Sequence, residues 1–252
     1  MMLKKDLIPN LDKIKFFNEI DKLIIDKIIG DCQLIKIPKG KLLFTQEQIA
    51  KFFYVVIEGS ISLTYLNQDG EELMVEIAEI GDFLNDIFME NFLVNAKSIN
   101  ASQVIAIDRL KIIDLIANNH SFAINFLNKN SQRNNKIFLH LIELKSNNGK
   151  FKLVNFLLGI FFDQGQKNKQ VLLKYNKSLI ASYLGIKPET FSRILKKLTS
   201  EGEIAIKKNL ITFLKIETLC KYCNLKTSGK CQDKKCRDEK NPDNKNPDNK
   251  NF

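Results

Sequence analysis

The chain has 252 residues, of which 44% are hydrophobic, so it is long enough to form two packed domains. The net charge of +10 is unevenly placed: residues 1–110 hold 12 Lys or Arg against 17 Asp or Glu, a net −5, whereas residues 166–216 hold 11 against 3, a net +8. The N-terminus lacks a signal-peptide core and no apolar run is long enough to span a membrane, which excludes a membrane protein and leads us to expect a cytoplasmic one.

The first half of the chain changes its apolar period. Residues 11–30 place apolar side chains at helical spacing, which predicts a helix or a helix pair. From Cys32 to Asp108 the period becomes two, in short segments rich in β-branched and aromatic residues and separated by turn residues. Several short strands at this spacing indicate an antiparallel sandwich or barrel.

Helical patterns return after residue 108. A short helix is predicted up to His120, and a long one from Ser121 that breaks near residues 146–150. Its polar middle, residues 128–135, means that its seam is not that of a strong coiled coil. Another apolar helix over 150–163 and a strand beginning at residue 171 are predicted to follow.

Residues 176–204 predict two short helices joined by a tight turn. Asn176 can cap the first helix, Gly185 ends it, and Pro188 suits the first position of the second. The buried face of the second helix is expected to consist of Phe191, Ile194, Leu195 and Leu198.

The opposite face of the second helix carries Glu189 and Arg193, four residues apart. Arginine can bond both O6 and N7 of a guanine, and a carboxylate can accept from cytosine N4. The alternative is a salt bridge on a solvated helix, which contributes only ~0.3–0.5 kcal/mol. Because the pair stands at the start of the helix and before Lys196 and Lys197, we favour DNA recognition.

A two-stranded wing with a basic tip is predicted after the second helix, because apolar residues alternate around Lys207 and Lys208. These lysines would contact phosphate and add affinity without sequence information. The predicted DNA-binding residues are Glu189, Thr190, Ser192, Arg193, Lys196, Lys197, Lys207 and Lys208.

The string PETFSR, Pro188 to Arg193, with IASYLG before it and ILKKLTSEGEI after it, resembles the winged helix-turn-helix of the Crp/Fnr transcription regulators. The likeness is closest to the Fnr and Dnr branches, in which a Glu, a Ser and an Arg read a TTGAT-like half-site. Glu189, Ser192 and Arg193 match those positions. The turn residues between Pro38 and Phe83 resemble the cyclic-nucleotide-binding β-roll of the same family.

This resemblance implies an α+β fold in four parts. They are a β-roll sensor with an N-terminal helix over 1–117, a dimerisation helix over 118–148, a winged helix-turn-helix over 149–216 and a Cys-rich, disordered tail over 217–252. It also implies a homodimer that binds an inverted repeat in double-stranded DNA and acts with RNA polymerase.

The effector pocket departs from the family's pattern. Where cyclic-nucleotide binders of this fold have Gly-Glu and Arg-Ser, this chain has Asn85-Asp86 and, with a shift of one residue, Lys97-Ser98. Asp is shorter than Glu, and Lys cannot make the bidentate phosphate contact of Arg. We therefore expect an effector other than cyclic AMP.

The nature of that effector is left open by the sequence. Closeness to the Dnr branch suggests nitric oxide sensed through haem, but the two histidines, His120 and His140, are assigned no ligand role.

Four of the five cysteines fall within seventeen residues, at positions Cys220, Cys223, Cys231 and Cys236. In a cytoplasmic protein such a cluster favours a metal or iron–sulfur site over disulfides, with unpaired or redox-reactive thiols as the alternative.

An enzyme is not expected, because the sequence shows no nucleophile with a nearby base, no phosphate-binding glycine loop and no paired catalytic carboxylates. A rival hypothesis is a nucleotide-binding-like module that regulates a protein partner through its C-terminal helices. The sequence does not identify the regulated genes, or distinguish an activator from a repressor.

Overall fold

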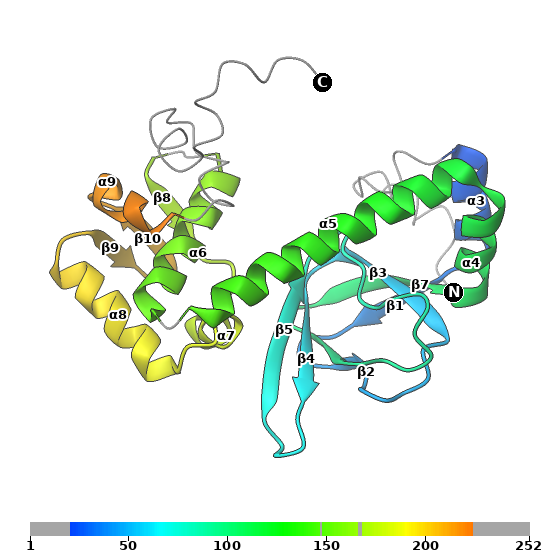
Figure 1. Ribbon diagram of the computed structural model, residues 1–252, viewed down its shortest axis with the longest axis horizontal. Coiled ribbons are helices and arrows are strands. Elements are labelled where there is room, and N and C mark those ends of the chain that lie inside the picture. The colour runs from blue at the N-terminus through cyan, green and yellow to red at the C-terminus, as the bar shows by residue number, and fades with distance from the viewer. Residues whose placement is uncertain (1–20, 147, 166–167, 224–252) are drawn as a thin grey trace. The chain divides into compact units, whose positions relative to one another are not determined.

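The computed structural model describes three stretches of the chain, residues 21–146, 148–165 and 168–223. The chain forms two compact units, Met1–Phe138 and Leu139–Phe252. Helix α5 (His120–Lys145) belongs to both, since it begins in the first and ends in the second (Figure 1).

Two antiparallel sheets build the N-terminal unit (Figure 1). The first has the strand order β1-β7-β3 and the second the order β2-β6-β4-β5. The strands are β1 (Gln33–Ile37), β2 (Leu42–Phe44), β3 (Phe52–Glu58), β4 (Ile61–Leu66), β5 (Glu72–Ala78), β6 (Asn95–Ser98) and β7 (Ser102–Asp108). The strands expected between Cys32 and Asp108 are thereby confirmed, and β6 is an additional strand that the sequence pattern did not predict.

Strand β3 is buried on both of its faces. Phe53 and Val55 belong to an apolar cluster that includes residues of α3 (Lys22–Asp31) and α4 (Arg109–Asn118), whereas Tyr54 and Val56 belong to a second cluster. Successive side chains of a strand point to opposite faces, so only a continuous apolar run can satisfy both clusters. The part of the predicted helix 11–30 that precedes residue 21 lies outside the described residues.

The C-terminal unit combines helices with a small antiparallel sheet of order β8-β10-β9. Its elements are α6 (Gly149–Asp163), β8 (Gln170–Leu172), α7 (Lys177–Tyr183), α8 (Pro188–Ser200), β9 (Ile204–Lys207), β10 (Leu210–Phe213), α9 (Ile216–Leu219) and the 3-10 turn η2 (Cys220–Tyr222). The predicted wing is therefore part of a three-stranded sheet, because β10 pairs with β8 as well as with β9.

Among its described residues, one apolar cluster holds this unit together. It contains Phe161 from α6, Phe191 and Leu195 from α8, and Phe213 from β10. A β-rich N-terminal unit, a long helix and a C-terminal helix-turn-helix confirm the predicted α+β fold class. Within the described residues no helix combines the length and the apolar character that a membrane span requires.

Candidate DNA-binding site

The two helices of the predicted DNA reader are bounded by local signals. The Asn176 side chain accepts a hydrogen bond from the N–H of Leu179 at 2.8 Å and so caps α7. Gly185 has a φ of +59°, a conformation that a residue without a Cβ adopts most readily, and it ends that helix. Pro188 occupies the first turn of α8, where a backbone N–H has no intrahelical partner to lose.

Helix α8 divides its side chains between core and solvent. Phe191, Leu195 and Leu198 are buried, and Ile194 is half-buried against the same cluster. This packing fixes the rotation of α8 on the rest of the unit. As a consequence, the opposite side of the helix faces solvent.

The predicted base readers lie on that solvent side. Glu189, Ser192 and Arg193 are all exposed. Among the ion pairs of the described residues, none joins Glu189 to Arg193, so the salt-bridge alternative receives no support from their geometry. Both side chains are therefore accessible from solvent.

The neighbouring predicted contacts differ in their availability. Lys196 is exposed and takes part in none of the described ion pairs, whereas the Nζ atom of Lys197 lies 3.7 Å from Oε1 of Glu201, the residue that follows α8. Thr190 is half-buried, and its methyl carbon lies close to Gly149 at the start of α6. Lys196 is therefore better placed than Thr190 to reach a phosphate.

A groove beside α8 is lined by Lys177, which the sequence did not predict as a DNA contact. Lys177, at the start of α7, and Lys196 line it, while Leu195 and Ile206 contribute apolar surface. Lys177 directly follows the capping residue Asn176. Its position at the start of the first helix of the pair is the feature of the sequence that could have predicted this contact. Two lysines on one groove are suited to contacting a phosphate backbone.

The wing tip is a two-residue turn. Lys207 pairs with Leu210, so Lys208 and Asn209 connect β9 to β10. Both lysines of the tip are exposed, and Lys208 has a φ of +57°. The predicted basic tip thus lies at the exposed end of the sheet.

Asn85 and Asp86, assigned to the effector pocket, both bond to backbone. The Asn85 side chain accepts from the N–H of Tyr54 at 3.0 Å and donates to the carbonyl of Phe52 at 3.1 Å. Asp86 accepts from the N–H of Phe88 at 2.8 Å. The Asn85 contacts tie the segment after β5 to strand β3, whereas the Asp86 contact is local to that segment.

Lys97 and Ser98, the other pair assigned to that pocket, lie in β6. Ser98 is buried and its hydroxyl contacts the carbonyl of Asn100 and the hydroxyl of Ser102, whereas Lys97 is exposed. Successive residues of a strand point to opposite faces, so Lys97 and Ser98 do not project together. A paired phosphate clamp of the Arg-Ser kind does not fit this geometry.

The two histidines occupy different surroundings. His140 is buried and stacks on Tyr183, with 4.0 Å between ring centroids and 8° between ring planes. His120 is the first residue of α5 and is exposed. The stack joins the last turns of α5 to helix α7 within the C-terminal unit.

Polar contacts from α6 hold the same end of α5. The Lys152 ammonium donates to the carbonyl of Leu144 at 3.0 Å, and Asn155 donates to the Glu143 carboxylate at 2.8 Å. Burial lowers the pKa of Lys152. A cation at a helix C-terminus also interacts favourably with the partial negative charge of the helix dipole.

The cysteine cluster is described in part. Cys220 is half-buried and Cys223 is buried within the C-terminal apolar cluster, while Cys231 and Cys236 lie outside the described residues. Within the described part of the chain, no three His, Cys, Asp or Glu side chains are grouped closely enough to hold a metal. A metal at the four cysteines stays a prediction.

Comparison with known proteins places this geometry in a family. Residues 34–119 match the cyclic nucleotide-binding domain, and residues 152–222 match the Crp-like helix-turn-helix domain. The nitrogen fixation regulation protein FixK of Bradyrhizobium diazoefficiens is 30% identical over 178 residues, which cover 66% of this chain and 72% of FixK. This chain belongs to the Crp/Fnr family of transcription regulators.

Two further relatives agree with this assignment. The probable transcriptional regulator flp of Lacticaseibacillus casei is 23% identical over 208 residues, which cover 81% of this chain and 92% of flp. The structure of FixK2 from Bradyrhizobium japonicum superposes with a TM-score of 0.67 at 18% identity, over 77% of this chain and 98% of FixK2. The second likeness concerns the fold alone. As a Crp/Fnr regulator, the chain is a DNA-binding protein of a family whose members regulate transcription.

Metal analysis tests the cysteine prediction. We expect the full chain, purified without oxygen, to carry zinc or iron in proportion to protein, because cysteine thiolates bind these metals well. A Cys220→Ser/Cys223→Ser variant should lose the metal, whereas Cys32→Ser, which changes a half-buried cysteine of the N-terminal unit, should keep it. Elemental analysis showing equal metal in all three proteins would contradict the prediction.

Proposed function

We propose that this Crp/Fnr regulator is a homodimer that reads a TTGAT-like inverted repeat with Glu189, Ser192 and Arg193 of α8. The observation that carries the proposal is the common exposed face on which α8 presents these side chains, opposite its buried apolar face. Lys177, Lys196, Lys207 and Lys208 would add phosphate contacts around it. RNA polymerase is the further partner expected of a transcription regulator, and we assign no residues to that contact.

Replacing Arg193 tests the base-reading role. We expect Arg193→Ala to lose its preference for a TTGAT-like palindrome over a scrambled duplex, at a cost of about 1–3 kcal/mol per half-site, because a bidentate contact to guanine is lost. Fluorescence anisotropy with the two duplexes measures both affinities at one salt concentration.

Lys196→Ala is the matched control, since it removes one positive charge from the same helix. We expect this variant to bind both duplexes more weakly by a similar factor, because a phosphate contact carries no sequence information. If Arg193→Ala discriminates between the duplexes as well as the wild type does, α8 does not read bases as proposed. The rival hypothesis, a module that acts on a protein partner, would then gain support.

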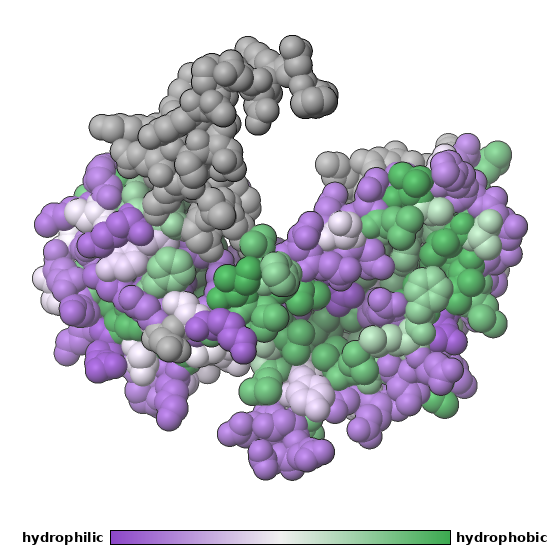
Figure 2. Space-filling model, in the orientation of Figure 1, coloured by the Kyte–Doolittle hydropathy of each residue, from purple (hydrophilic) through white to green (hydrophobic). Residues whose placement is uncertain are grey.

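The dimer is proposed to form along α5. Five apolar side chains of this helix are exposed: Ile124, Leu127, Phe138, Leu141 and Ile142. Figure 2 shows apolar surface over two parts of α5 with hydrophilic surface between them, in agreement with the polar middle of the helix. Exposed apolar side chains that recur along one helix are suited to packing against a second copy.

A charged variant tests this seam. We expect Leu141→Glu/Ile142→Glu to be monomeric at concentrations where the wild type is a dimer, because four carboxylates would meet in the seam. Sedimentation velocity distinguishes the two states. Leu110→Glu is the control, since Leu110 is an exposed leucine of α4 outside the proposed seam. A double variant that remains dimeric would show that the subunits associate elsewhere.

We further propose that the regulator answers to an effector other than cyclic AMP. The contacts of Asn85 and Asp86 with backbone, and the opposite directions of Lys97 and Ser98, support this proposal. Isothermal titration of the full chain with cyclic AMP should show no binding, and operator affinity should not change on its addition. Saturable binding of cyclic AMP would overturn the proposal. Haem stays a prediction without an assigned ligand.

A further inference from the structure

Helix α5 carries three cations on the face opposite its exposed apolar residues. Lys129, Arg133 and Lys136 follow one another at spacings of four and three residues. Each residue turns an α-helix by about 100°, so these side chains share one face. Leu127 and Phe138 project from the other side by the same rule. The helix therefore has a basic face and an apolar face.

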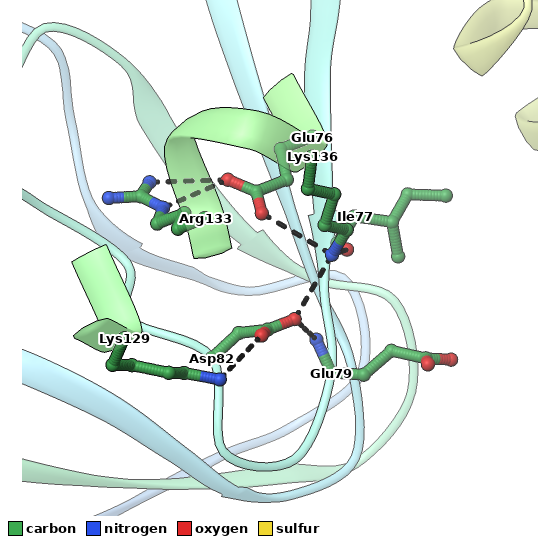
Figure 3. A network of polar contacts seen from close by, with 7 residues as sticks. All are labelled: Glu76, Ile77, Glu79, Asp82, Lys129, Arg133 and Lys136. Atoms are coloured by element: carbon green, nitrogen blue, oxygen red, sulfur yellow. Dashed lines mark hydrogen bonds and ion pairs between the residues drawn. The ribbon is translucent and has the colours of Figure 1, made fainter. Parts of the chain in front are cut away.

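The basic face meets two carboxylates of the N-terminal unit (Figure 3). Arg133 donates from Nε and Nη2 to the Oε2 atom of Glu76, at 3.3 and 3.2 Å. Lys136 bridges both acids, with its Nζ 3.4 Å from Glu76 Oε1 and 3.2 Å from Asp82 Oδ2. Lys129 lies 3.4 Å from the other carboxylate oxygen of Asp82.

Strand β5 and the turn after it hold these carboxylates in place. Glu76 lies in β5 and only 3% of its side chain is exposed. Asp82 accepts a hydrogen bond from the N–H of Glu79 at 3.1 Å, which fixes its carboxylate at the end of the turn. A carboxylate as buried as Glu76 is costly unless positive charges neutralise it. The cations of α5 meet this requirement.

Apolar anchoring of α5 in the N-terminal unit ends where the ion pairs begin. Phe122 and Phe126 are buried at 1% and 2% exposure, and they belong to the cluster that contains β3. Residues 127–138 are all described by the structure, and none of them is buried. The contacts with Glu76 and Asp82 are thus the main attachment of this stretch to the β-roll.

The charges of the network persist over a wide pH range. Burial would raise the pKa of Asp82, but Lys136, the Glu79 N–H and Lys129 outweigh burial and hold that pKa below its usual value. Burial would lower the pKa of Lys136, but Asp82 and Glu76 outweigh it and hold that pKa above its usual value.

The sign of each shift sets the pH at which its contribution is lost. The stabilisation from Asp82 is lost only as the pH falls below about 3.9, and that from Lys136 only as the pH rises above about 10.4. A change of pH near neutrality therefore leaves the charges of Asp82 and Lys136 in place.

We propose that Glu76 and Asp82 form an internal docking site that holds the middle of α5 and turns its apolar face outward for dimerisation without a bound small molecule. This inference rests on the proposed dimer along α5. In this arrangement the chain's own carboxylates order the helix before a second copy arrives. An effector would then act by strengthening or breaking this contact.

Hydrogen exchange of the full chain, freed of small molecules by gel filtration and checked by mass spectrometry, tests the docking step. We expect residues 129–138 of the wild type to exchange slowly. In Glu76→Gln the same residues should exchange at least about tenfold faster, because breaking a buried charge pair is costly. Residues 120–126 should be unchanged, since Phe122 and Phe126 anchor them. Fast exchange in the wild type, or equal exchange in both proteins, would overturn the inference.

The dimer dissociation constant supplies a second readout. We expect Glu76→Gln to weaken the dimer at least about tenfold while non-specific DNA binding persists, because α8 is untouched. Lys136→Met should act in the same direction, and its partly exposed side chain makes it the safer variant if Glu76→Gln does not fold. Glu90→Gln removes an exposed carboxylate of the same unit and should change nothing. A dimer as tight in both network variants as in the wild type would overturn the inference.

Failure of the proposed function gives a different result. A wild-type chain that is monomeric and does not bind the palindrome would refute the proposed dimeric reader. The exchange of residues 129–138 would still decide whether Glu76 docks the helix. The two proposals can therefore fail separately.

Discussion

A buried carboxylate needs positive charge beside it, and in this chain that requirement connects a sheet to the helix that crosses both units. Glu76 faces Arg133 and Lys136, so the orientation of α5 on the β-roll follows from charge as well as from apolar packing. At its other end, α5 is held within the C-terminal unit by Lys152 and by the stack of His140 on Tyr183. A helix attached at both ends is a suitable element for passing a change from one unit to the other.

The recognition helix depends on a simpler constraint. Phe191, Leu195 and Leu198 must be buried, because α8 supplies part of the apolar cluster that the described residues of the C-terminal unit form. Burying that face leaves Glu189 and Arg193 on the solvent side. The same amphipathic pattern therefore stabilises the unit and presents the polar side chains suited to reading DNA.

Local signals and long-range contacts differ in how well a sequence reveals them. The cap at Asn176, the turn at Gly185 and the proline at the start of α8 act within a few residues, and all three lie where the pattern predicts. Lys97 and Ser98 were assigned by analogy to the phosphate-binding pair of the effector pocket, but they lie in β6, whose pairing with β2 and β4 involves residues far away in the chain. A segment of four residues contains no pattern that predicts such pairing. The strand β8 was predicted, but its pairing with β10 became visible for the same reason only in the structure.

Sequence alone determined the class of the fold, the helix-turn-helix and the residues on its polar face, because helical period, capping and turn chemistry are properties of neighbouring residues. The tertiary structure decided which charges meet. In the sequence, Glu76 and Asp82 stand more than forty positions before the three cations of α5. Burial of Glu76 and the ion pairs that the fold permits join these residues into one network. Charge pairing across such separations depends on the folded backbone, which no local pattern encodes.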